Sequence, residues 1–204
     1  MYARSLALCS LLLASPGFLR SAPPIPVRSN SLNLYLRTDG GSSVDTLTEM
    51  RSELAALMRP TAFQVHWRYG NRATGKQEGV LVVVDLEGSC TPPEGTLPPE
   101  GRATVRVASS AVANGVVLPF ARVDCTALNR VLSADISAQS EPSQERSYGR
   151  ALARVLAHEL YHLLGQTTDH TRQGLTKARI GRSELLGEHV GFTSGALARF
   201  SRLP

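Results

Sequence analysis

The spacing of apolar residues changes near the start of the ordered chain, from every second residue to every third or fourth residue. Leu32, Leu34 and Leu36 alternate with polar or aromatic side chains, and this period of two predicts a half-buried strand. In segment 44–58 the apolar residues recur at intervals of three and four, which predicts an amphipathic helix ended by Pro60. Order therefore begins near Leu32 with a strand and a helix.

Short segments with alternating or continuous apolar residues, separated by turn residues, predict four more strands. They lie at 63–67, 80–86, 103–108 and 116–123. The apolar run 80–86 is continuous, which favours a strand buried on both faces. Segment 88–101 is rich in proline, so we expect a loop there.

A second amphipathic helix is predicted from about Tyr148 to Leu164, along a stripe of leucines. The polar segment before it reads as turns, and Ser143 or Ser147 can cap the helix. Gly165 is placed to end it in the left-handed conformation.

These elements predict an α/β fold in a single domain, residues 32–204. We expect a twisted mixed β-sheet with helices 44–58 and 148–164 packed on it, and a short helical part from about 183 to 202. The chain has 204 residues and 42% apolar content, which is enough for one hydrophobic core.

Residues 1–22 have the pattern of a secretory signal peptide. Arg4 gives a short basic start, and an apolar stretch follows at 6–14. Pro16 interrupts it well before the length of about 20 residues that a membrane helix needs. A buried N-terminal helix is the alternative. We expect a secreted or periplasmic protein with a disordered lead-in at 23–31 and no membrane span.

Charge and cysteine content narrow the classes of function. The formal charge is +5, of which +3 remains without Arg4 and Arg20. The basic residues are scattered, which argues against a nucleic-acid-binding protein. Without Cys9 two cysteines remain, and an oxidising compartment predicts a disulfide bond between Cys90 and Cys125. Two buried reduced thiols are the alternative.

The segment 158–162 reads His-Glu-Leu-Tyr-His. On a helix, His158 and His162 lie about 40° apart and one turn along, so both imidazoles can reach one ion. Catalytic zinc takes three protein ligands and a water, and Glu159 beside that water can accept its proton as general base. The alternative is a helix that merely carries two surface histidines and a glutamate.

The stretch HELYHLLGQTTDH, residues 158–170, resembles the zinc signature of the metzincins, in which HExxHxxG precedes a third His or Asp. Gly165 matches the signature glycine, but Thr168 stands where the third ligand usually falls. The stretch up to residue 186 more closely resembles a group of exported bacterial proteins with HELYH, a His twelve residues after the first His, and a Gly-x-x-Lys turn. This resemblance implies His170 as the third ligand.

The resemblance leaves two points open. Asp169 and Glu184 are alternative third ligands, and Asp169 could instead accept a hydrogen bond from a ligand imidazole. Metzincins also place a methionine turn beneath the metal, whereas this chain has no Met after His170. Leu175 or Thr176 then takes that packing role, or the floor of the site is built differently.

The sequence thus predicts a monomeric zinc metallopeptidase, a hydrolase of the metzincin-like type. His158, His162 and His170 would bind Zn²⁺, and Glu159 would act as general base in the hydrolysis of a protein or peptide substrate. One alternative is an exported zinc-binding protein without turnover. The other is an exported binding module in which the HExxH motif is accidental.

Overall fold

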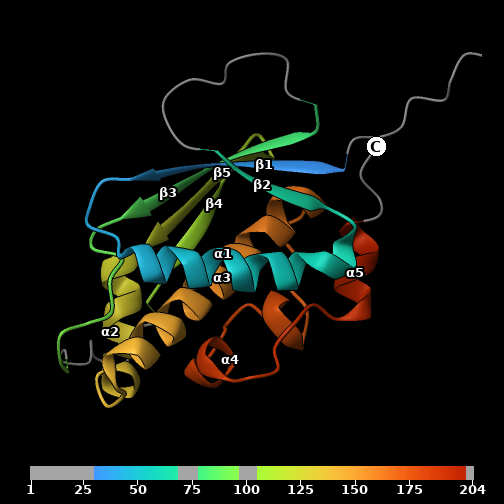
Figure 1. Ribbon diagram of the computed structural model, residues 1–204. Coiled ribbons are helices and arrows are strands. Elements are labelled where there is room, and N and C mark those ends of the chain that lie inside the picture. Colours follow the sequence, from blue (N-terminus) through green and yellow to red (C-terminus); the bar gives the residue numbers. More distant parts are fainter. Residues whose placement is uncertain (1–29, 69–77, 97–104, 201–204) are drawn as a thin grey trace, which may run out of the picture.

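Five strands form one mixed β-sheet in the computed structural model, which describes residues 30–68, 78–96 and 105–200 (Figure 1). The strands are β1 (Ser31–Thr38), β2 (Gln64–Arg68), β3 (Val80–Glu87), β4 (Ala108–Ala113) and β5 (Val116–Asp124). Their spatial order is β2-β1-β3-β5-β4, and every pair is parallel except that the edge strand β4 runs antiparallel to β5. The predicted α/β class with a mixed sheet is confirmed. The predicted signal segment 1–22 lies outside the described residues.

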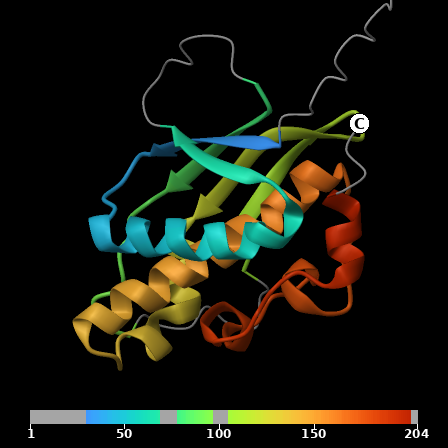
Figure 2. The same ribbon diagram turned by 45° about the vertical axis from the view of Figure 1, so that its right-hand side comes forward.

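The helices lie on one side of this sheet. They are α1 (Val44–Met58), α2 (Cys125–Ile136), α3 (Glu141–Gly165), α4 (Arg182–Leu186) and α5 (Ser194–Phe200). Both ribbon views show α1 and α3 crossing the same face of the sheet (Figures 1 and 2). At Gly149 the two helices come so close that an added Cβ would lie 2.6 Å from the carbonyl oxygen of Thr46. The central helix α3 also contacts β4, β5, α4 and α5.

The sheet is buried on one face only. In β3, Val82 and Val84 are fully buried, whereas Leu81 is 37% exposed. Asp85, which shares the outer face with Leu81, forms an ion pair with Arg37. The prediction that strand 80–86 is buried on both faces is therefore wrong, because the described helices cover just one side.

Cys90 and Cys125 form the predicted disulfide bond. Cys90 follows β3, Cys125 is the first residue of α2, and both are fully buried. The two cysteines are 35 residues apart in sequence, and closing a loop of that length stabilises a fold by about 3 to 4 kcal/mol in the chain-entropy description. The bond ties the proline-rich loop to the helical layer.

Several predicted boundaries are wrong. The next strand in the described part of the chain, β4, starts at Ala108, where the predicted strand 103–108 was expected to end, and positions 103 and 104 lie outside the described residues. The helix α3 begins at Glu141 rather than near Tyr148, with Pro142 in its first turn. Proline is well tolerated there, because the first turn of a helix needs no donor at that position.

The predicted caps of this helix are also wrong. Its N-cap is Ser140, so Ser143 and Ser147 lie inside the helix. The helical part predicted at 183–202 divides into α4 and α5 with a non-helical segment between them. The helix α2 was not predicted at all.

Candidate metal centre

Two histidines on α3 face each other across one helical turn. The Nε2 atoms of His158 and His162 are 3.1 Å apart. The apolar side of the same turns, including Leu156, Leu160 and Leu163, is buried in the core. Burial of this stripe fixes the rotation of α3 and so fixes the direction in which both imidazoles point.

The outer nitrogens of these rings are held by backbone carbonyls. His158 Nδ1 donates a hydrogen bond to the carbonyl oxygen of Leu175 at 2.7 Å, and His162 Nδ1 donates to that of Thr167 at 2.8 Å. A carbonyl can only accept, so each Nδ1 carries a proton. In the neutral rings both Nε2 atoms therefore have free lone pairs, which is the form that binds a metal ion.

Burial also favours the neutral form of both rings. It lowers the pKa of His158 and of His162, and this effect outweighs the hydrogen bonds to Leu175 and Thr167, which raise the two values. Burial thus favours the neutral rings, in which the Nε2 lone pairs are available for a cation.

His170 comes from the loop after α3 and completes a group of three. Its ring centroid lies 5.3 Å from that of His158 and 4.7 Å from that of His162. One nitrogen from each ring can be chosen so that all three lie within 4.8 Å of one another. His170 is exposed, so its ring has room to move towards the other two. The three histidines predicted from sequence are therefore brought together.

The donor set fits a metal ion. Two nitrogens bound to one tetrahedral zinc at 2.0–2.1 Å are about 3.3 Å apart, close to the separation of the two Nε2 atoms on α3. Two lone pairs that face each other cannot hydrogen-bond to one another, whereas a cation between them and His170 satisfies all three. Three close imidazoles could therefore bind a divalent ion, and they do not by themselves fix which one.

The chain turns towards His170 at Gln166 rather than at Gly165. Gln166 has the left-handed backbone conformation, with φ of 43°, and it follows the last helical residue, Gly165. The prediction for Gly165 is therefore wrong. An added Cβ at that glycine would lie 3.3 Å from the side chain of Thr167, so the residue serves a close approach instead.

Glu159 lies beside the histidines with one carboxylate oxygen anchored. Its Oε2 accepts a hydrogen bond of 2.6 Å from the Oγ atom of Ser110 on β4. Burial raises the pKa of Glu159, and the bond from Ser110 is the strongest effect that opposes this rise. Glu159 is therefore anchored on β4 and lines one cavity with the three histidines.

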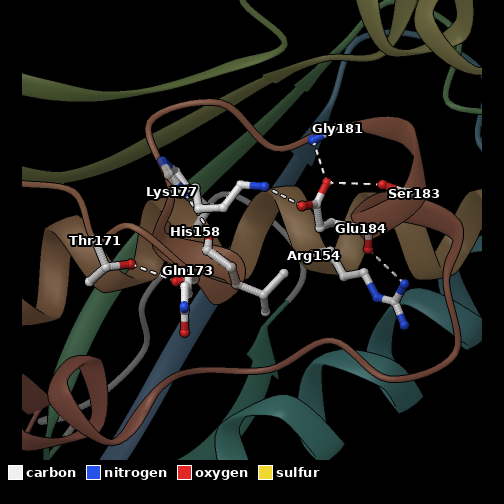
Figure 3. Close-up of polar contacts among 9 residues, drawn as sticks. Arg154, His158, Thr171, Gln173, Lys177, Gly181, Ser183 and Glu184 are labelled. Atoms are coloured by element: carbon white, nitrogen blue, oxygen red, sulfur yellow. Dashed lines mark hydrogen bonds and ion pairs between the residues drawn. The ribbon is translucent and has the colours of Figure 1, made fainter.

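The alternative third ligands have other partners. Asp169 forms an ion pair of 3.0 Å with Arg199, and its side chain is 69% exposed. Glu184 forms an ion pair with Lys177 and accepts a hydrogen bond from the backbone of Gly181 (Figure 3). Neither carboxylate belongs to the group of close ligand atoms found among the described residues.

The floor of the site is the turn Gly174–Thr176, which contains no methionine. Leu175 and Thr176 are fully buried there, and the carbonyl of Leu175 orients His158. Gly174 has φ of 73°, and an added Cβ would lie 2.7 Å from the carbonyl oxygen of Gly191. Leu175 is thus buried in the core and also orients His158 through its carbonyl.

Two cavities flank the candidate centre along β4. One of about 480 Å³ is lined by His158, Glu159 and residues 105–108. The other, of about 370 Å³, is lined by all three histidines and by β4 residues as far as Val112. The centre therefore lies at the meeting point of two hollows that follow the edge of the sheet.

Ser110 and Arg106 were missed by sequence reasoning. Both line these cavities, but the predicted strand 103–108 ends before Ser110 and gives Arg106 no special place. The packing of β4 on α3 brings Ser110 to the site, and Arg106 lies in the segment just before β4; no local pattern encodes this packing.

No protein-family model matches the sequence, and a search of curated proteins gave no match. Among the helices of the described residues, none is long and apolar enough to cross a membrane. The assignment of function therefore rests on the chemistry of the site.

Proposed function

We propose that this protein is an exported zinc-dependent endopeptidase. The observation that carries the proposal is the pairing of two groups on one helix. His158 and His162 direct unprotonated Nε2 atoms towards one point, and Glu159, between them in sequence, lines one cavity with all three histidines and has its Oε2 held by Ser110. Three imidazoles with an adjacent carboxylate suit catalytic zinc better than Mg²⁺ or Ca²⁺, which prefer oxygen ligands.

The role of each residue in the proposed reaction follows from its contacts. His158, His162 and His170 would hold the ion, which supplies Lewis acidity and a water of lowered pKa. Glu159 accepts the proton of the attacking water and later delivers it to the leaving amine. Ser110 holds Oε2, so the reacting oxygen Oε1 keeps a fixed direction.

The surroundings favour an extended peptide as the substrate. Among the described strands β4 pairs with β5 alone, so its other backbone edge can pair with an added strand. The cavities on either side of the centre can each receive side chains of such a peptide. Space on both sides of the scissile bond suits cleavage within a chain rather than at its end.

Export is supported by two independent features. Residues 1–22 have the pattern of a signal peptide, and the disulfide between Cys90 and Cys125 is typical of oxidising compartments.

The Glu159→Gln variant tests the proposed chemistry. Gln keeps the size and the contact with Ser110 but cannot accept a proton, so peptide hydrolysis should fall by at least about a hundredfold. Zinc content, measured by atomic emission, should remain at one equivalent. Full activity in the variant would refute the mechanism. A wild-type protein that binds zinc and cleaves no peptide in a broad library would favour the zinc-binding protein without turnover.

A further inference from the structure

The larger cavity beside the candidate centre has a distinctive lining. Val107, Val155 and Leu185 are among its apolar walls, and Arg106, Lys177 and Arg179 are its cations. Among the lining residues that the structure describes, Glu159 is the sole carboxylate, and the proposed mechanism already uses it. The cavity thus combines an apolar interior with an excess of positive charge.

Two of the three cations are available to a ligand. Lys177 is neutralised by its ion pair with Glu184. Arg106 and Arg179 are exposed, and neither forms an ion pair with a carboxylate within the part of the chain that the structure describes. Their guanidinium groups can bind a carboxylate in a two-pronged geometry.

We propose that this cavity selects peptides with an acidic side chain, Asp or Glu, next to the scissile bond. The inference rests on the proposed peptidase function and names its substrate class. The aliphatic part of the side chain would contact Val107, Val155 and Leu185, while its carboxylate meets Arg106 and Arg179.

The direction of β4 predicts which side of the scissile bond carries the acid. β4 runs from Ala108, which borders this cavity, towards Val112, which borders the other cavity. A peptide that pairs antiparallel to β4 therefore places the residues after the scissile bond over the cationic cavity. We expect the acidic residue at the first or second position after the bond.

The test uses synthetic peptides that carry Asp, Glu, Ala or Lys at each of four positions around one scissile bond. The zinc-loaded wild type should cleave acidic peptides with kcat/KM at least about tenfold above the Ala peptides. Because two exposed arginines act, the preference should shrink as salt is raised from low to high ionic strength. Binding of the same peptides to zinc-loaded Glu159→Gln protein, followed by fluorescence anisotropy, should show the same order.

The double variant Arg106→Glu/Arg179→Glu should lose the acidic preference and favour Lys at the same position. Arg122→Glu is the matched control, since Arg122 is an exposed arginine on β5 that pairs with Glu87 away from the cavity lining. It should keep the wild-type preference.

The outcomes separate the two proposals. Cleavage without an acidic preference overturns the inference and leaves the peptidase function intact. An acidic preference that survives the double variant overturns the assignment to this cavity. If no peptide is cleaved, the peptidase function fails, and equal binding of acidic and neutral peptides to the Glu159→Gln protein then overturns the inference as well.

Discussion

Two polar clusters lie about one turn apart on α3, one around Arg154 and the other around His158 and His162. They use their hydrogen-bonding groups in opposite ways. Arg154 is 1% exposed, and its Nε donates to Glu53 at 2.8 Å. Its Nη1 donates to the backbone carbonyls of Glu184, Leu185 and Gly187, of which Figure 3 shows the bond to Glu184. Every one of these contacts joins a donor to an acceptor within the chain, and together they fasten α1 and the C-terminal segment to α3.

The histidine cluster has the reverse pattern. The donors of His158 and His162 are used on carbonyls, and their acceptor nitrogens face each other at 3.1 Å. Acceptors that converge without a donor between them do not stabilise a fold by themselves. Donor–acceptor matching therefore separates a polar cluster that stabilises the fold from one that can bind a ligand.

Arg154→Ala should have the largest effect of the substitutions that distinguish the two clusters, and this effect is on the stability of the fold. Removing this side chain leaves Glu53 and the carbonyls of segment 184–187 without their partner, which should lower the free energy of unfolding by about 3 to 5 kcal/mol. Urea denaturation of metal-free protein measures the change. Arg146→Ala, at an exposed position of α3, is the control and should shift stability by less than about 0.5 kcal/mol.

The claim that the histidines do not stabilise the metal-free fold would be contradicted if His162→Ala lowered the free energy of unfolding as much as Arg154→Ala does in the absence of metal. In that case the histidines would also be structural, and the proposed site would lose its main support.

The next largest effect should be on zinc affinity, when the third ligand, His170, is replaced. His170→Ala should weaken zinc binding by at least about a hundredfold, because one of three imidazole bonds is lost. Asp169→Ala should weaken it by less than about tenfold, since its carboxylate holds Arg199 and no ligand imidazole. Competition with a chromophoric chelator at fixed pH measures the affinities. Loss of zinc from Glu184→Ala with zinc retained in His170→Ala would show that the ligand set is wrong.

Local patterns predicted the parts of the fold that are locally determined. The helix at 44–58 and the histidine pair follow from helical spacing within a few turns, and both agree with the structure. The helix α2 carried the same signal, because Leu128, Leu132 and Ile136 recur at four and are buried. That signal was overlooked.

Other features depend on residues far apart in sequence. The first turns of α3 look like a polar loop because residues 141–147 are not fully buried, so no apolar stripe marks the helix there. One-sided burial of β3 is a property of the whole sheet, and an apolar sequence does not reveal it. The contact of Ser110 with Glu159 spans 49 residues and exists only through the packing of β4 on α3.

The smallest effect should come from Ser110→Ala, which removes that contact. We expect kcat to fall by about tenfold with zinc content unchanged, since the hydroxyl orients Glu159 and belongs to none of the metal ligands. Burial raises the pKa of Glu159 and the Ser110 bond lowers it, so the variant should have a still higher pKa. A base works only when deprotonated, and the acidic limb of the pH–rate profile should therefore move to higher pH.

Ser110→Thr keeps the hydroxyl and should restore both kcat and the profile. If the profile of Ser110→Ala is unchanged, Glu159 needs no anchor on β4. The sheet would then support the histidine cluster of α3 no more than it supports the Arg154 cluster.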